Sequence, residues 1–224
     1  MASVVEVWRY PVKSMAGERL DSCEVAQTGL VGDRRFALID GSPTRAGKPL
    51  TIRENDRLMS YRARLGGRGV EVVTPDGEVV GMDERLVAPL AAASSRPLTL
   101  RELEGANFDD SPVLLVNLAT VAAFAVEAGM HVDHRRFRAN LYVSGLALEE
   151  EIGWIGRSVT VGDAELEVVS RCERCVVITK DPDTGVPTPE LLRVLTRTQE
   201  TCMGVYCRVA RPGRVAAGDH VHLV

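Results

Sequence analysis

The sequence predicts a β-rich fold of the α+β class with a few helices. In its first part, short runs rich in β-branched residues recur at intervals of roughly 8–12 residues, a spacing typical of a barrel or sandwich. Turn-forming residues separate these runs, and Thr74-Pro75-Asp76-Gly77 is a strong hairpin signal. Aromatic residues make up only 4% of the 224 residues, so small and β-branched side chains build much of the expected core.

The first part of the chain is expected to hold strands joined by tight turns. Residues 3–10 alternate between apolar and polar side chains, which predicts a strand. Further strands are expected at residues 19–26, 36–40, 58–65, 70–73 and 78–80. Residues 83–93 fit a short helix that ends at Ser94-Ser95-Arg96-Pro97. We place a domain boundary there, between residues 1–95 and 96–224.

The second part combines strands with two clearer helices. Residues 113–116 form an apolar run suited to a buried strand. A helix capped by Asn117 or Thr120 should follow and run through Ala128. Another helix opens at Thr188-Pro189-Glu190, which supply an N-cap, a first-position proline and an early acid. Further strands or hairpins are expected at residues 98–103, 140–144, 154–164, 203–209 and 218–224.

Composition narrows the class of protein. With 27 Lys and Arg against 31 Asp and Glu, the chain is mildly acidic, which argues against bulk nucleic-acid binding but permits a local basic pocket. No run of about 18 apolar residues is present, so no membrane span is expected. The N-terminus lacks a basic region followed by an apolar one, so we expect a cytoplasmic protein whose five cysteines are reduced.

Two thiols stand out at the centre of the second part. Cys172 and Cys175 lie in a short basic loop between two β-branched runs, which predicts a strand, a loop and a second strand. The turn Asp181-Pro182-Asp183-Thr184-Gly185 follows. Arg171 and Arg174 flank the thiols, and a nearby cation favours the thiolate, the form that attacks electrophiles or binds a soft metal.

The residues alone leave four interpretations of these thiols open. They could be half of a zinc site, completed from Cys202, Cys207, His220 and His222. They could be a thioredoxin-type dithiol, although that motif opens a helix and the flanks here read as strands. They could be two ordinary buried thiols. Finally, one thiolate could bind a soft metal or carry a sulfur, with basic and polar groups converging on an anionic cofactor. Those groups would be Lys13, Ser14, Arg35, Arg138 and Arg174.

An ordered set of motifs decides between these interpretations. The set is Tyr10-Pro11-Val12-Lys13-Ser14, Asp33-Arg34-Arg35-Phe36, Thr51-Ile52-Arg53, Asp110-Ser111-Pro112, Phe137-Arg138-Ala139-Asn140, Cys172-Glu173-Arg174-Cys175, Asp181-Pro182-Asp183-Thr184-Gly185 and Gly204-Val205-Tyr206. Over nearly its whole length the chain resembles the MOSC family with its N-terminal β-barrel partner. This family comprises the C-terminal domains of molybdenum cofactor sulfurases and the mitochondrial amidoxime reducing component.

The resemblance implies a fold, a cofactor and a set of site residues. It implies a MOSC-type β-barrel at residues 96–224 and an N-terminal barrel-like domain at residues 1–95. It further implies that the pterin form of the molybdenum cofactor binds, with Cys175 as metal ligand and catalytic residue. Lys13 and Ser14 would contact the cofactor's phosphate. The full set of implied cofactor contacts is Lys13, Ser14, Arg35, Asp110, Ser111, Arg138, Glu173, Arg174 and Tyr206.

The resemblance also implies an activity. We expect a molybdenum-dependent oxidoreductase that reduces N-hydroxylated small molecules, with neither nucleic acid nor membrane as partner. Because no ferredoxin-like domain follows, the electrons should come from separate ferredoxin- or flavoprotein-type proteins. The alternative is a sulfur or cofactor carrier that uses a persulfide on Cys175 with a pyridoxal-phosphate-dependent desulfurase. One departure is Glu173, whose charge would oppose an anionic cofactor unless it points away.

Overall fold

The computed structural model describes residues 1–67, 69–103 and 108–224. Its largest element is an eight-stranded sheet. Its strand order is β17-β13-β14-β15-β11-β12-β1-β2. Neighbouring strands are antiparallel except for β11 and β12, which are parallel. The strands are β1 (Ser3–Arg9), β2 (Glu18–Leu20), β11 (Val113–Asn117), β12 (Leu141–Ser144), β13 (Ser158–Val161), β14 (Ala164–Glu173), β15 (Cys202–Arg211) and β17 (Val221–Leu223).

This sheet curls into a half-barrel, so that β1 contacts the segment just before β17. Ser3 bridges His220, and Val4 N donates to the Asp219 carbonyl at 2.8 Å, so the first strand meets the C-terminal segment. A three-stranded sheet of β16 (Gly213–Ala216), β3 (Ser22–Ala26) and β4 (Gly29–Leu30) lies beside it. The predicted β-rich fold with barrel character is therefore confirmed.

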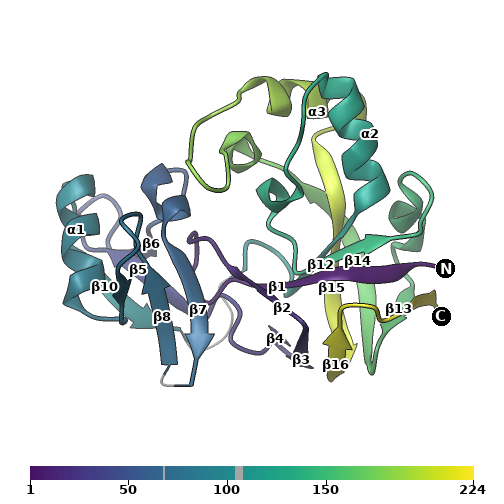
Figure 1. Ribbon diagram of the computed structural model, residues 1–224, viewed down its shortest axis with the longest axis horizontal. Coiled ribbons are helices and arrows are strands. Elements are labelled where there is room, and N and C mark those ends of the chain that lie inside the picture. The colour runs from purple at the N-terminus through teal and green to yellow at the C-terminus, as the bar shows by residue number, and fades with distance from the viewer. Residues whose placement is uncertain (68, 104–107) are drawn as a thin grey trace.

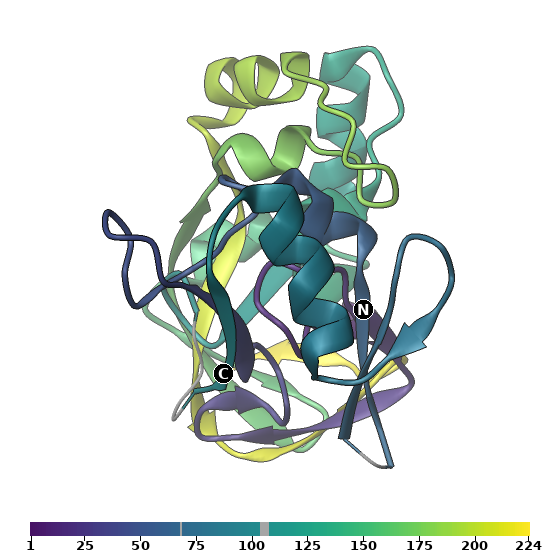
Figure 2. The same cartoon turned by 90° about the vertical axis from the view of Figure 1, so that its left-hand side faces the viewer.

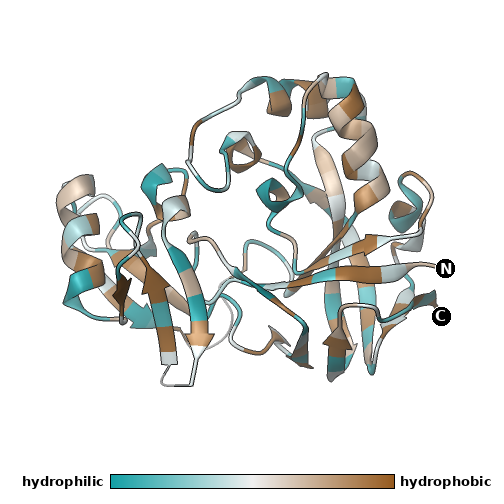
Figure 3. Ribbon diagram, viewed as in Figure 1, coloured by the Kyte–Doolittle hydropathy of each residue, from teal (hydrophilic) through white to brown (hydrophobic). Residues whose placement is uncertain are grey.

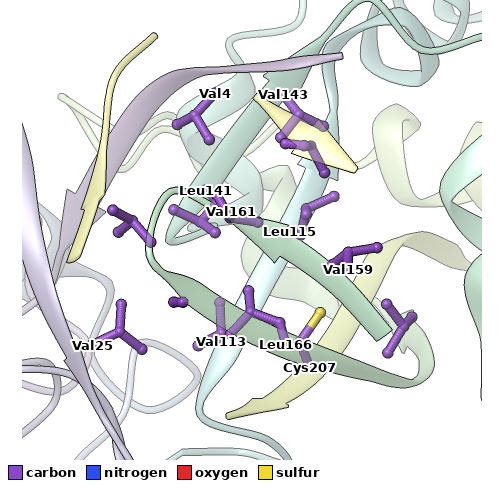
Figure 4. Close-up of a cluster of buried hydrophobic side chains, with 14 of the residues drawn as sticks. Val4, Val25, Val113, Leu115, Leu141, Val143, Val159, Val161, Leu166 and Cys207 are labelled. Atoms are coloured by element: carbon purple, nitrogen blue, oxygen red, sulfur yellow. The ribbon is translucent and has the colours of Figure 1, made fainter. Parts of the chain in front are cut away.

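One hydrophobic core fills the concave side of the curl (Figure 4). Val7, Leu115, Leu141 and Val159 are fully buried there, and each comes from a different strand. Burying such side chains is worth about 1.5–3 kcal/mol each. Because the residues are mostly valine and leucine, the core agrees with the scarcity of aromatic residues in the sequence.

Two helices cover the other face of the sheet (Figure 1). Helix α2 (Leu118–Ala128) begins where predicted, because the Asn117 side chain caps Ala119 N at 3.0 Å. Helix α3 (Glu190–Gln199) starts directly after Pro189, and Thr188 does not cap it with its side chain. Phe124, Phe137 and Leu195 are among the residues of the second core between helices and sheet.

The remaining strands form a small lobe with a core of its own. Figure 2 looks onto this lobe with α1 in front, and Figure 3 shows apolar residues along β8 and β10. Its elements are β5 (Phe36–Asp40), β6 (Lys48–Pro49), η1 (Asp56–Ser60), β7 (Arg62–Gly66), β8 (Gly69–Val73), β9 (Val79–Val80), α1 (Glu84–Ser94) and β10 (Leu98–Glu102). Leu38, Leu58, Val72 and Leu86 are buried together in it.

The two predicted domains share sheets. Strand β1 from the first domain pairs with β12 from the second, and β3 pairs with β16. Residues 1–95 and 96–224 are therefore interleaved, with the small lobe joined to the large sheet through β1–β4. Among the described residues, no helix is long and apolar enough to cross a membrane.

The strand predicted after the thiol loop is wrong. Residues Val176–Thr179 form a 3₁₀ helix, η4, in which Ile178 N donates to the Cys175 carbonyl at 3.2 Å. The reason lies outside the segment: β14 already pairs with β15, and Arg174 N donates to the Thr201 carbonyl at 2.8 Å. The run is also too short for periodicity to separate a strand from a buried turn of helix.

Candidate functional site

A cavity of about 470 Å³ lies where the small lobe meets the large sheet. Segments from both lobes line it, including the loop between β1 and β2, the turn after β6 and the end of β14. Nine of the ten site residues expected from the sequence lie on its wall. They are Lys13, Ser14, Asp110, Ser111, Arg138, Glu173, Arg174, Cys175 and Tyr206.

The loop between β1 and β2 brings two polar side chains to the wall. Lys13 N donates to the Phe36 carbonyl at 2.8 Å, which ties the loop to the small lobe. Lys13 Nζ reaches Asp109 at 2.9 Å. Ser14 is buried and has a φ of 72°, a left-handed conformation that a non-glycine residue adopts at a cost of about 1–3 kcal/mol.

The tenth expected residue, Arg35, lies outside the cavity, and Arg34 lines the wall instead. Arg34 has a φ of 49°, and its guanidinium donates to Asp33 and to the Arg138 carbonyl at 3.1 Å. Arg35 points outward, is 58% exposed and pairs with Glu102 at 2.8 Å. Adjacent residues entering a strand face opposite sides, and the sequence does not say which of two arginines faces inward.

Arg138 is a partly buried cation of the cavity wall. Its Nη2 donates to the Met15 carbonyl at 2.8 Å, and its guanidinium carbon lies 4.5 Å from the centre of the Tyr10 ring. Arg34 contacts the same ring at 4.8 Å. Burial lowers the pKa of Arg138 to about 10, which leaves the side chain charged at neutral pH. Two cations are thus held by one aromatic ring at the cavity wall.

Asp33 and Asn140 hold Arg34 in place. Asp33 is buried and accepts from Tyr10 N at 2.6 Å and from Asn140 Nδ2 at 3.1 Å, besides its ion pair with Arg34. Asn140 Nδ2 also donates to the Trp8 carbonyl at 3.2 Å. The asparagine of the Phe-Arg-x-Asn motif therefore links β1 to the arginine-bearing turns.

The two thiols have different environments. Cys172 is fully buried, and Arg174 Nη1 donates to its Sγ while Nη2 donates to the Phe137 carbonyl at 2.6 Å. Cys175 is partly exposed on the cavity wall, at the start of η4. In the described part of the chain, no group of three or more His, Cys, Asp or Glu could hold a metal ion.

Arg53 is a site residue that the sequence reasoning missed. Its Nη2 donates to Cys175 Sγ at 3.3 Å, and it pairs with Asp109 at 3.8 Å. The hydrogen bond and charge of Cys175 raise the pKa of Arg53. A signal was available: Thr51 and Glu54 have the spacing of a capping box, and Thr51 N donates to Glu54 at 2.8 Å. Such a tight turn leaves Arg53 with a fixed backbone.

Comparison with known proteins gives the family. Residues 100–222 match the model of the MOSC domain, and residues 1–111 match that of the MOSC N-terminal beta barrel domain. The chain belongs to the MOSC family. The order of motifs along the chain had pointed to the same family.

Several relatives match this MOSC protein over most of its length. It is 30% identical to mitochondrial amidoxime-reducing component 1 of Homo sapiens, over 100% of this chain and 83% of that protein. It is 31% identical to mitochondrial amidoxime reducing component 2 of Rattus norvegicus, over 99% of this chain and 83% of that protein. It is 28% identical to the molybdenum cofactor sulfurase of Caenorhabditis elegans, over 92% of this chain but only 33% of that protein.

Two crystal structures share the fold of this MOSC protein. The YuaD protein from Bacillus subtilis matches with a TM-score of 0.55 at 16% identity, covering 99% of this chain and 94% of that one. YiiM from Escherichia coli matches with a TM-score of 0.50 at 14% identity, covering 100% and 70%. At such identities the likeness concerns the fold alone.

Proposed function

We propose that this MOSC protein is an oxidoreductase that binds the molybdenum cofactor through Cys175 and reduces N-hydroxylated small molecules. The observation that carries the proposal is the position of Cys175, a partly exposed thiol on a cavity wall shared by cations from both lobes. Support also comes from relatives named amidoxime-reducing component, which match nearly the whole chain.

The chemistry of the wall fits such a cofactor. Six cationic side chains line the cavity against three carboxylates, so the wall carries an excess of positive charge that suits a phosphate-bearing anion. These side chains are Lys13, Arg34, Arg53, Arg138, Arg171 and Arg174, with Asp109, Asp110 and Glu173. Arg174 Nε is buried and has no hydrogen-bond partner among the described residues, which leaves a donor for a ligand. A thiolate is a good ligand for a soft metal.

We assign roles to the wall residues on this basis. Lys13 and the Ser14 hydroxyl bind the phosphate, while Arg34 and Arg138 hold the pterin through charge and donated hydrogen bonds. When bound, the cofactor supplies the two-electron chemistry that removes oxygen from nitrogen. Burial, with the neighbouring Cys172, raises the pKa of Tyr206, so its Oη keeps a proton and acts as a donor at the wall.

Glu173 does not exclude an anionic cofactor. It is exposed on the cavity wall, where water screens its charge. Asp109 is exposed too; although desolvation opposes ionisation, the hydrogen bond and charge of Lys13, with Arg53, hold its pKa below the usual value. The three carboxylates of the wall are thus exposed to solvent, whereas Arg34, Arg138 and Arg174 are only partly exposed.

The overall reaction consumes two electrons and two protons and releases water, as in R–NHOH to R–NH₂. We infer that the electrons come from a separate ferredoxin- or flavoprotein-type protein, which would supply two electrons per turnover.

Metal and pterin analysis tests the proposal. Protein purified from a host that makes the cofactor should contain about one molybdenum and one pterin per chain, and with a chemical reductant it should convert benzamidoxime to benzamidine. Protein free of molybdenum from such a host would contradict the proposal.

A sulfur-carrier function is the second candidate, favoured by the partial exposure of the Cys175 thiol and by the sulfurase relatives. In that case a desulfurase would leave a persulfide on Cys175. Intact-protein mass spectrometry distinguishes the two, since one added sulfur on Cys175 without bound pterin indicates transfer.

Because Arg34 rather than Arg35 lines the cavity, variants of these two arginines give a sharper prediction. Arg34→Gln should lower the bound pterin per folded chain about tenfold, because it removes a charged donor from the wall. Arg35→Gln removes the same charge one residue away and should leave the pterin content unchanged, because Arg35 faces solvent. Pterin fluorescence after denaturation measures both, and circular dichroism checks folding. Equal losses in the two variants would contradict the assignment.

A further inference from the structure

Arg53 differs from the other arginines discussed for the cavity wall in the acceptors to which its N–H groups donate. Arg34, Arg138 and Arg174 each donate to a backbone carbonyl, which fixes them as part of the wall. Arg53 comes from the small lobe, is 46% exposed and makes one side-chain hydrogen bond within residues 1–67, 69–103 and 108–224, to Cys175 Sγ. Its Nη2 also lies 3.8 Å from the Asp109 carboxylate, an ion pair longer than a hydrogen bond, so hydrogen bonds to the described residues do not saturate the guanidinium.

The backbone that carries Arg53 is fixed by a chain of polar contacts. Glu54 accepts from Thr51 N at 2.8 Å and pairs with Arg45 at 3.1 Å. Arg45 and Arg96 both pair with the buried carboxylate of Asp40. Ile52, the neighbouring residue, is buried. A guanidinium on such a turn is held at a defined position without being saturated by protein acceptors.

We propose that Arg53 is a substrate-orienting residue that donates a hydrogen bond to the oxygen of the N–O group when substrate binds beside Cys175. The inference rests on the proposed function, since it places the substrate at the Cys175 side of the cavity. It adds that the protein selects compounds by an acceptor oxygen on nitrogen. A guanidinium is suited to this role because its donors are rigid and always charged.

Equilibrium binding to the oxidised, cofactor-loaded protein tests this without turnover, because no electron donor is present. Benzamidoxime and benzamidine differ in the N–O oxygen, and calorimetry measures the affinity of each. Arg53→Gln should weaken benzamidoxime binding about tenfold. Benzamidine binding should not weaken, because this cation lacks the oxygen and gains from the loss of a positive charge.

Two further variants separate the proposed orientation of the substrate from a general effect of removing a positive charge. Arg57→Gln removes an exposed cation of the same lobe that does not line the cavity, and it should change neither affinity. Arg53→Lys keeps the charge but not the fork and should recover part of the loss. In steady state, Arg53→Gln should raise the KM for benzamidoxime in proportion to its weaker binding.

Three results would overturn the inference. One is an equal loss of affinity for benzamidoxime and benzamidine in Arg53→Gln. Another is unchanged benzamidoxime affinity. The third is a loss of molybdenum and pterin in Arg53→Gln, which would make Arg53 part of the cofactor site. A wild-type protein without molybdenum is a different outcome, because it contradicts the proposed function itself.

Discussion

Cys175→Ala should yield a folded protein without molybdenum and without detectable reductase activity. Among the described residues of the wall, Cys175 carries the one group suited to a soft metal, and alanine supplies no donor atom. Losing a first ligand should reduce activity by at least about 10³-fold. Molybdenum by elemental analysis and benzamidoxime reduction with a chemical reductant measure the two effects. Pterin content should fall less, because Lys13, Ser14 and Arg138 remain.

Cys202→Ala is the matched control for this variant. Cys202 is also partly exposed, but it does not line the cavity, so molybdenum content and activity should match the wild type. Cys175→Ser tests the chemistry further, because a hydroxyl is a harder and far less acidic donor and should not restore metal binding. Stoichiometric molybdenum in Cys175→Ala would refute the assigned ligand.

Asp33→Ala should lower the free energy of unfolding by about 3–5 kcal/mol, because removing one partner of a buried ion pair leaves the other charge uncompensated. Asp33 is 3% exposed, and it accepts from Tyr10 N, from Asn140 Nδ2 and from the Arg34 guanidinium. In the variant Tyr10 N would lose its side-chain acceptor, while Asn140 Nδ2 would keep the Trp8 carbonyl and Arg34 the Arg138 carbonyl. Urea denaturation followed by circular dichroism measures the change.

Asp109→Ala provides the comparison for Asp33. Asp109 also pairs with cations of the cavity wall, but it is 60% exposed, and such surface pairs contribute about 0–1 kcal/mol. The two variants remove the same functional group, from a buried position in one case and from an exposed position in the other. A similar, small loss in both would contradict the view that Asp33 is the buried anchor of the site.

The features that could be predicted from the sequence depend on near neighbours in the chain. The Asn117 cap and the end of α2 at Ala128 involve side chains within a few residues of the backbone they bind. The hairpin between β8 and β9 likewise follows from the turn residues between them. Nine of the ten residues expected from the family motifs lie on one wall, and most of them come from turns or strand ends, whereas Tyr206 lies within β15.

The two differences between the prediction and the structure depend on residues that are far apart in the chain. Arg34 and Arg35 are chemically identical in sequence, and the distant Asp33–Asn140–Trp8 contacts select Arg34. Residues 176–179 have strand-like composition, yet they follow the end of β14, which pairs with β15, and they form a 3₁₀ helix instead.

The sequence by itself determined the family and the start and end of α2, because these depend on residue identity and short-range hydrogen bonding. The tertiary structure decided which arginine faces inward and brought Arg53 to Cys175, 122 positions along the chain. It also interleaved the two halves through β1 and β3. Such pairings depend on which surfaces bury each other, and chain spacing does not encode that.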